Sequence, residues 1–352
     1  MSIVITDSTI NADNIDGERF EIHINKELGR GSNGVVYKSS SEYFGGVFVL
    51  KTTKVKKVKK DINFYCRSII SSIEILTSFP TCSRYFLCTY GIIVNNSDKE
   101  KIDSEILRIL VEKNLIFVSE SIEPNIIYLL YEFINGETIG QKIKNAIENN
   151  EEIDYVSYMQ NILENLIYLQ QRDFVHLDLK PENFMVDSNN NVIFIDTEFL
   201  CNRKNQETCK MNAMTPNYVS LEGYDSMFSH NKYIGTDYLF KTDIFACGLV
   251  FYEMIMKQKS EHKIYEIFKK MEGPELDLKF SDDKLMWKPL IDGMTRRHYT
   301  DRLDAVNALL LFEKIKFSLM GGGVKHVEIK ENAEIKANTE IKKIKNKIIL
   351  KI

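Results

Sequence analysis

The alternation of apolar and polar positions divides the chain into a β-rich first part and a mainly helical second part. Runs rich in Val, Ile, Phe and Tyr, broken by glycine, begin at Phe20 and are typical of an antiparallel meander: FEIHINKELGRG, NGVVYKSS and GGVFVLKTT, then YFLCTYGIIV and NIIYLLYEF. Between these groups, DINFYCRSIISSIEILTSF repeats apolar residues at helical spacing and predicts a helix that ends before Pro80. We therefore expect the first part to fold mainly as strands, with one helix among them.

Helical spacing dominates from Gly136 to about Ser318. The clearest segments are QKIKNAIENN, YMQNILENLIYLQQR, KTDIFACGLVFYEMIMK and RLDAVNALLLFEKI. One β excursion, FMVDSNNNVIFID, interrupts them, because two apolar runs are joined there by a turn of Asp, Ser and Asn.

Three further segments stand apart from this pattern. Residues 1–20 are polar with isolated isoleucines and are expected to form a short tail or a loose leading strand. Residues 95–124 are interpreted as an insertion between two strands, with Ile102, Ile106, Ile109 and Leu110 on one helical face. Residues 319–352 form a charged tail in which Glu-Ile-Lys recurs, and strand, helix and disorder all remain open for it, as do a solvated tail and a docking peptide.

Composition and charge restrict the class of protein. The chain has 352 residues, 44% of them hydrophobic, and a formal net charge of −4, so no global basic field is available for nucleic acid or an anionic membrane. No apolar stretch reaches the roughly 18 residues of a membrane span, and the N-terminus lacks a secretory signal. We expect a soluble, intracellular protein with no nucleic-acid partner and no membrane insertion. The oligomeric state stays open.

Cysteine use and codon bias add little chemistry. The six cysteines form no Cys-x-x-Cys pair and are expected to be reduced thiols, mostly packing residues. Heavy use of Ile, Asn and Lys is typical of proteins from AT-rich genomes, and a large DNA virus is one such source. With such a source, the expected location is the cytoplasm of a host cell or the virion.

The first segment that points to chemistry is a glycine-rich run between two predicted strands, Gly29-Arg30-Gly31-Ser32-Asn33-Gly34-Val35-Val36. Glycines let the backbone approach phosphate oxygens closely and offer N–H groups to them. Taken alone, the run is a weak signal, because glycines in a hairpin are more often simple turn residues.

Two charged residues follow the glycine run at useful positions. Lys51 ends the strand run VFVLK, where its ammonium can pair with nucleotide phosphates. Glu74 is the one carboxylate well inside the next predicted helix, and it could pair with Lys51 and orient it.

The segment VHLDLKPENFMV combines a base, a cation and a metal ligand. Asp178 is placed to accept a hydroxyl proton, Lys180 to meet the transferring phosphoryl group, and Asn183 to ligate a hard cation. Asp196 follows the apolar run VIFI, where a carboxylate can hold Mg²⁺ that bridges phosphates. Each of these residues by itself could have a purely structural role. Purely structural roles do not account for all of them occurring in this order.

In this order the residues resemble those of a eukaryotic-type protein kinase of the serine/threonine type, from about Glu21 to Phe317, and HLDLKPEN is the most specific part. The resemblance implies a two-lobed α+β fold, with a β-rich N-lobe over 21–134 and a mainly helical C-lobe over 135–318. It also implies ATP and Mg²⁺ as cofactors and proteins as substrates.

The resemblance assigns further roles. The segment from Leu28 to Val36 would cover the phosphates, and the hinge would present backbone groups of Glu132 and Ile134 to adenine. The other assigned positions are the ribose neighbour Glu137, the purine-sandwiching Val49 and Met185, and the gatekeeper Tyr131. In MTPNYVSLE and beyond, the family pattern places Thr215 near Asp178, a buried ion pair between Glu222 and Arg302, and Asp243 in support of the catalytic loop. Lys180 and Thr215 together favour serine or threonine acceptors.

Three departures from the family pattern affect the interpretation. Leu177 stands where an arginine normally receives an activation-loop phosphate, so activation by that route is not expected. Thr197 and Glu198 replace the Phe-Gly that follows the metal-binding aspartate, which removes an aromatic packing residue and adds a carboxylate near the metal. Ser220-Leu221 replaces Ala-Pro before Glu222.

Two alternatives to an active protein kinase remain open. One is a pseudokinase that acts as a binding scaffold, which Leu177, Thr197 and Glu198 favour. The other is phosphoryl transfer to a small molecule. The segment MTPNYVSLE, which resembles the family's peptide-binding segment, and the Glu222–Arg302 pair argue against it. An active kinase is favoured because the four residues required by the mechanism are present: Lys51, Asp178, Asn183 and Asp196.

Overall fold

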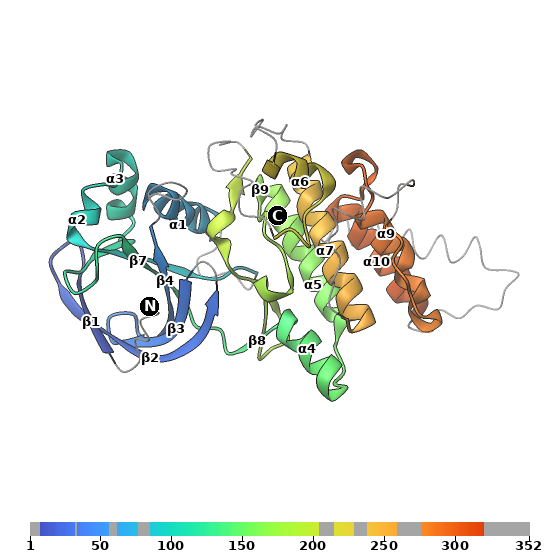
Figure 1. Ribbon diagram of the computed structural model, residues 1–352, viewed down its shortest axis with the longest axis horizontal. Coiled ribbons are helices and arrows are strands. Elements are labelled where there is room, and N and C mark those ends of the chain that lie inside the picture. Colours follow the sequence, from blue (N-terminus) through green and yellow to red (C-terminus); the bar gives the residue numbers. More distant parts are fainter. Residues whose placement is uncertain are drawn as a thin grey trace, which may run out of the picture. The chain divides into compact units, whose positions relative to one another are not determined.

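A closed barrel forms the β-rich part of the chain in the computed structural model (Figure 1). The structure describes residues 8–31, 34–55, 62–76, 85–203, 215–228, 238–258, 273 and 276–319, with backbone alone at 74–76, 199 and 225–228. Around the barrel the strands follow the order β1 (Ser8–Asp13), β2 (Arg19–Gly31), β3 (Gly34–Ser41), β4 (Gly46–Lys54), β7 (Ile126–Glu132), β5 (Thr89–Val94) and β6 (Ile116–Val118). Neighbouring strands are antiparallel, except for the parallel pair β5 and β6.

Residues of β7 alternate between two hydrophobic cores. Tyr128 and Leu130 join the core that holds Phe48 of β4, whereas Leu129 and Tyr131 join the core beneath helix α1 (Ile62–Leu76). Since successive side chains of a strand point to opposite faces, covering both faces produces the unbroken apolar run seen in the sequence. Lys51 pairs with Leu129 in the sheet and therefore belongs to the face that α1 covers.

Of the two alternatives for the N-terminal segment, a short tail or a leading strand, the structure has a strand at Ser8–Asp13. β1 pairs with β2 in continuous register from Ser8 to Asp13, and Ile10 and Ala12 are buried in the core. Its sequence, STINAD, has apolar side chains at two positions only, so hydrophobic spacing alone does not distinguish it from a polar tail. The backbone hydrogen bonds to the longer strand β2 stabilise β1, although its own sequence carries few apolar residues.

The segment 95–124 contributes both helices and a strand. It contains α2 (Asn96–Lys99), α3 (Ser104–Glu112) and β6. The predicted helical face is confirmed in part: Ile106 and Leu110 of α3 are buried, Ile109 is partly buried, and Ile102 lies before the helix. Helix α3 packs beside α1 (Figure 1). The Asp103 side chain caps α3 by accepting the backbone N–H groups of Glu105 and Ile106.

The second part is mainly helical, as the sequence pattern predicts. Its helices are α4 (Ile139–Asn149), α5 (Tyr155–Gln171), α6 (Leu221–Phe228), α7 (Leu239–Met256), α9 (Lys288–Met294) and α10 (Ala305–Leu319), with 3₁₀ turns η1 (Pro181–Asn183), η2 (Thr197–Phe199), η6 (Asp282–Trp287) and η7 (Tyr299–Asp301). Almost every residue of α7 is buried, which marks it as a central helix. Among the described helices, none is long and apolar enough to cross a membrane.

The predicted hairpin within the helical part is confirmed. β10 (Phe184–Asp187) and β11 (Val192–Phe194) pair antiparallel, and β8 (Gly136–Thr138) extends their sheet. A further short pair joins β9 (Phe174–Val175) and β12 (Cys201–Asn202).

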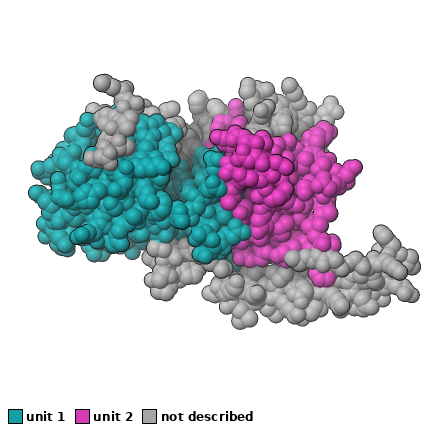
Figure 2. All heavy atoms as spheres, turned by 90° about the horizontal axis from the view of Figure 1, so that it is seen from below, with its two compact units in different colours: residues 1–141, 169–213 teal, residues 142–168, 214–352 magenta. Residues whose placement is uncertain are grey.

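The chain groups into two compact units (Figure 2): residues 1–141 with 169–213, and residues 142–168 with 214–352. Residues 169–213 belong with the barrel because Phe194 accepts a backbone hydrogen bond from Leu87 and donates one to Tyr85. This grouping differs from the predicted division at residue 134. The tail, from residue 320 onward, lies outside the described residues.

The cysteines correct another expectation. Cys66 and Cys247 are buried and form no disulfide bond, and burial raises the pKa of the Cys247 thiol well above its usual value. Cys88 and Cys201, in contrast, are disulfide-bonded, so they are not reduced thiols. Spacing in the sequence does not show which thiols the fold brings together.

Candidate active site

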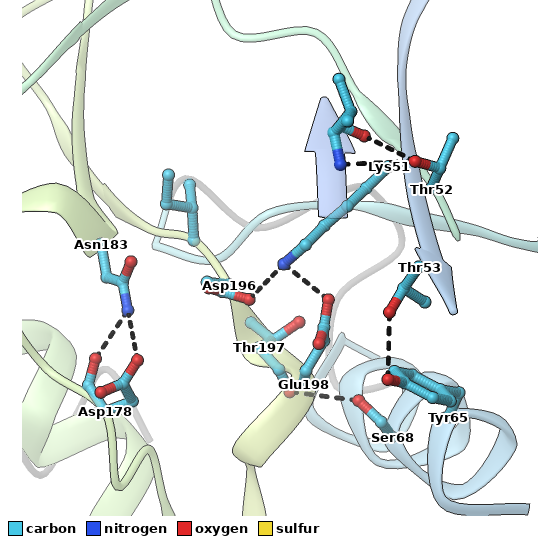
Figure 3. A network of polar contacts seen from close by, with 12 residues as sticks. Lys51, Thr52, Thr53, Tyr65, Ser68, Asp178, Asn183, Asp196, Thr197 and Glu198 are labelled. Atoms are coloured by element: carbon cyan, nitrogen blue, oxygen red, sulfur yellow. Dashed lines mark hydrogen bonds and ion pairs between the residues drawn. The ribbon is translucent and has the colours of Figure 1, made fainter. Parts of the chain in front are cut away.

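Lys51 lies between two carboxylates (Figure 3). Its Nζ atom is 2.7 Å from Oδ1 of Asp196 and 2.6 Å from Oε1 of Glu198. Burial by itself would lower the pKa of the Lys51 ammonium, but the charges of Asp196 and Glu198 outweigh that effect and hold the pKa well above its usual value. Lys51 is therefore held as a cation, and it lies inside the barrel strand β4 rather than at its end as expected, because the strand continues to Lys54.

The backbone after β11 explains why both carboxylates reach the same ammonium. Asp196 has left-handed backbone angles, φ 59° and ψ 51°, and the 3₁₀ turn η2 begins directly after it. Asp is among the residues that tolerate this conformation best. Although burial opposes ionisation of Asp196, the neighbouring Lys51 lowers the pKa of the Asp196 carboxyl below its usual value.

Thr197 occupies a polar slot beside helix α1. Its hydroxyl lies 2.9 Å from the Ser72 hydroxyl. Its backbone oxygen accepts a bond of 3.4 Å from the Ser68 hydroxyl (Figure 3). All three side chains are buried. The family pattern has an aromatic residue at position 197, which would pack against apolar groups. Here serines on α1 contact Thr197 instead, so hydrogen bonds hold η2 in place of apolar packing.

Asp178 carries a compact set of hydrogen bonds. The Lys180 ammonium donates to its Oδ2 at 2.8 Å, and the Asn183 amide donates to Oδ2 at 3.2 Å and to the Asp178 backbone oxygen at 2.7 Å. Asp178 is buried, with 4% of its surface exposed, and Leu177 before it has a positive φ of 68°. A leucine held in that conformation is strained, which is typical of a functional loop.

His176 connects the loop of Asp178 to the strand that leads to Asp196. Its Nε2 lies 3.1 Å from the backbone oxygen of Ile195, and because a carbonyl oxygen can only accept, the ring donates from Nε2. Burial lowers the pKa of His176, which favours the neutral ring. The two loops therefore share a fixed hydrogen bond next to both carboxylates.

Asn183 and Asp196 offer oxygens that fit a hard cation. Because the Asn183 amide nitrogen bonds Asp178, its amide oxygen points away from Asp178 (Figure 3). In the part of the chain that the structure describes, no three or more His, Cys, Asp or Glu side chains cluster as a metal site of their own. The residues fit a magnesium ion that takes its remaining ligands from phosphates and water.

The glycine-rich hairpin joins β2 to β3. Gly29 and Gly31 face open space, where an added Cβ would meet no atom within 4 Å, whereas a Cβ on Gly34 would lie 1.6 Å from the backbone oxygen of Thr52. Gly34 is thus required by the close approach of β4. Gly29 and Gly31 leave room for a phosphate. Ser32 and Asn33 lie outside the described residues.

These glycines predict a separation of stability from binding. Gly34→Ala should destabilise the chain by about 2 kcal/mol, because the Cβ meets a backbone atom and the residue has a φ of 156°. Gly31→Ala should leave the thermal midpoint unchanged and weaken ATP binding. Thermal melts and calorimetric titration of ATP test both variants, and equal melting temperatures for the two would contradict the different roles.

The remaining nucleotide-site predictions are placed as follows. Leu28 is exposed, and Arg30 forms a two-pronged ion pair with Glu27, with N–O distances of 2.7 and 3.1 Å. Glu132 at the end of β7 exchanges two hydrogen bonds with the Cys88 backbone, one through its own backbone N–H and one through its carboxylate. Burial raises the pKa of the Glu132 carboxyl.

Val49 and Ile134 pack against the core that contains Tyr131, whereas Met185 lies in β10 opposite Thr138 and Glu137 is exposed in β8. The sandwich of a purine between Val49 and Met185 stays a prediction. Glu74 lies in α1, but its side chain is outside the described residues, so its pairing with Lys51 is untested.

The predicted ion pair of the second unit is confirmed. Arg302 binds both carboxylate oxygens of Glu222, one of them at 2.9 Å, and its side chain has no exposed surface. Backbone oxygens of Arg296, Arg297 and Lys241 also accept from its guanidinium. Thr215 and Asp243 belong to the same unit.

Sequence reasoning missed the contact between Glu198 and Lys51. The available signal was the charge itself, a carboxylate where the family pattern has glycine. The hydroxyl pair of Ser72 and Thr197 was also missed, because neither side chain carries a motif.

Comparison with known proteins agrees with this site. The model of the protein kinase domain family matches residues 22–309, and the chain therefore belongs to the protein kinase family. It is 28% identical over 165 residues to human myosin light chain kinase 2, skeletal/cardiac muscle, over 163 residues to human myosin light chain kinase family member 4, and over 167 residues to rice CBL-interacting protein kinase 15.

These matches are partial. They cover 44–45% of this chain and 26%, 40% and 35% of the three relatives in the order given. The matched relatives are animal and plant proteins, and they give no support to a viral source.

Proposed function

We propose that the chain is an active kinase that transfers the γ-phosphoryl group of ATP to serine or threonine hydroxyls of protein substrates. The observation that carries the proposal is the Asp178 carboxylate, buried and fixed by Lys180 and Asn183, in the same unit as the Lys51–Asp196 pair. This is the arrangement of a proton acceptor beside a phosphate-binding cation.

Each part of the nucleotide has a proposed partner. The open space at Gly29 and Gly31 would admit the phosphates to backbone N–H groups, and Lys51 would contact them. Adenine would meet backbone groups of Glu132 and Ile134, with Val49 and Met185 on either side of the ring and Glu137 near the ribose. Asn183 and Asp196 would hold Mg²⁺, which when bound neutralises charge on the phosphates.

In the proposed reaction, the substrate hydroxyl gives its proton to Asp178 while its oxygen forms a bond to the γ-phosphorus. The bond from that phosphorus to the bridging oxygen breaks, and ADP leaves with the electron pair. Lys180 lies 2.8 Å from the Asp178 carboxylate, where its charge can stabilise the transferring group. We also propose an intracellular location and protein substrates, with no nucleic-acid partner.

A transfer assay tests the proposal. Purified chain with radiolabelled Mg-ATP and generic protein substrates should give phosphoserine and phosphothreonine without phosphotyrosine. ATP bound without any transfer would overturn the proposal and favour the alternative, a pseudokinase that binds nucleotide as a scaffold. Two observations favour this alternative: Leu177 stands where the family pattern has arginine, and two carboxylates occupy Lys51.

A further inference from the structure

The two carboxylates on Lys51 differ in their access to solvent. The Glu198 side chain is completely buried, whereas 21% of the Asp196 side chain is exposed. An arriving phosphate or cation can reach Asp196 but not Glu198. The two groups are therefore suited to different tasks, although they meet the same ammonium (Figure 3).

Helix α1 presents hydroxyls to this region. Tyr65 contacts the Thr53 hydroxyl of β4 at 3.0 Å, and Ser68 and Ser72 contact Thr197. Positions 65, 68 and 72 share one helical face. None of the described side chains of α1, residues 62–73, is a carboxylate, so this face offers Lys51 no negative charge.

Glu74 has a described backbone only, and its position on the helix follows from helical geometry. It follows Ser72 by two residues, which rotates it by about 200° around the helix axis. The helix that the family pattern uses to orient the lysine thus turns serines and a tyrosine toward β4 and η2.

We propose that Glu198 is the positioning residue for Lys51 and replaces a carboxylate on α1 in that task. The inference rests on the proposed function and names the residue that orients its phosphate-binding cation. Glu198 would stay on Lys51 if Asp196 bound a metal ion, because a buried carboxylate without its cation is strongly unfavourable. The hydroxyl contacts of Ser68 and Ser72 hold Thr197, and with it the turn that aims Glu198 at the lysine.

A double-mutant cycle tests this role. The variants are Glu198→Gln, Lys51→Met, their combination, and Glu74→Gln for the competing assignment. Glu105→Gln, at an exposed position of α3, is the matched control. For each one, Mg-ATP binding is measured by calorimetry, kcat and KM by phosphoryl transfer, and the thermal midpoint by melting.

We expect Glu198→Gln to lower kcat by about a hundredfold, with a smaller change in KM for ATP. The control Glu105→Gln should stay within about twofold of wild type, and Glu74→Gln should lose less activity than Glu198→Gln. The double variant should be no slower than Lys51→Met alone, because Glu198 acts through the lysine. If Glu198→Gln is too unstable to assay, the double variant should recover the thermal midpoint, since it removes both buried charges.

Several results would overturn the inference. These are wild-type turnover in Glu198→Gln, tighter ATP binding in that variant, losses that add in full in the double variant, or a loss in Glu74→Gln as large as in Glu198→Gln.

Absence of transfer in wild type would instead refute the proposed function. In that case, the ATP-binding measurements test whether Glu198 positions Lys51. The role of Glu198 is supported if Lys51→Met weakens ATP binding by about tenfold in the wild-type background but not in the Glu198→Gln background. It is contradicted if the weakening is equal in both backgrounds.

Discussion

Asp178→Asn should lower kcat for phosphoryl transfer by at least about a thousandfold and leave the dissociation constant of ATP within about threefold of wild type. The amide has the shape of the carboxylate and can still accept a hydrogen bond from Lys180, but it cannot take up the hydroxyl proton. The glycine hairpin and Lys51, which are proposed to bind the phosphates, are unchanged. Transfer rates and calorimetric ATP titrations check the two halves of this expectation.

Asp282→Asn is the matched control, since Asp282 is exposed in η6 and belongs to the other unit. It should keep wild-type activity. Turnover of Asp178→Asn within tenfold of wild type would remove Asp178 from the role of base, and the carboxylate set would have to be reassigned.

Arg302→Met should lower the free energy of unfolding by about 3–5 kcal/mol, because it leaves the Glu222 carboxylate and three backbone oxygens without their donor. Trp287 is the single tryptophan of the sequence and is fully buried in the same unit as Arg302. Urea unfolding followed through its fluorescence therefore reports on that unit.

Arg108→Met provides the comparison. Arg108 pairs with Glu112, but both side chains are more than half exposed, so its loss should not measurably change stability. A loss below about 1 kcal/mol for Arg302→Met would show that the buried pair contributes little and that packing carries the stability of this region.

Much of the site could be predicted because its contacts are local. Asp178, Lys180 and Asn183 lie within a few residues, and the short turn η1 brings their side chains together with little help from the rest of the fold. Lys51 and Asp196 are 145 residues apart, and no periodicity connects them. Their meeting was expected only because their order along the chain resembles a family.

The contact between Glu198 and Lys51 could not be predicted from the sequence. The sequence offered Glu74 as the partner of Lys51, and that pairing stays a prediction because the Glu74 side chain lies outside the described residues. The structure places Glu198 on the lysine, because a left-handed residue at 196 and a 3₁₀ turn after it bring alternate side chains to the same side. Backbone angles of that kind have no signature in hydrophobic spacing.

The sequence by itself determined the α+β character, the long helices, the β10–β11 hairpin and the local grouping of Asp178, Lys180 and Asn183, since these follow from local periodicity, turn chemistry and short-range motifs. Only the tertiary structure decided that β1 completes the barrel, that residues 169–213 group with it, and that Glu198 reaches Lys51. The physical reason is that a local pattern specifies which face of an element is buried, whereas the partner of that face is selected by contacts between residues far apart in the chain.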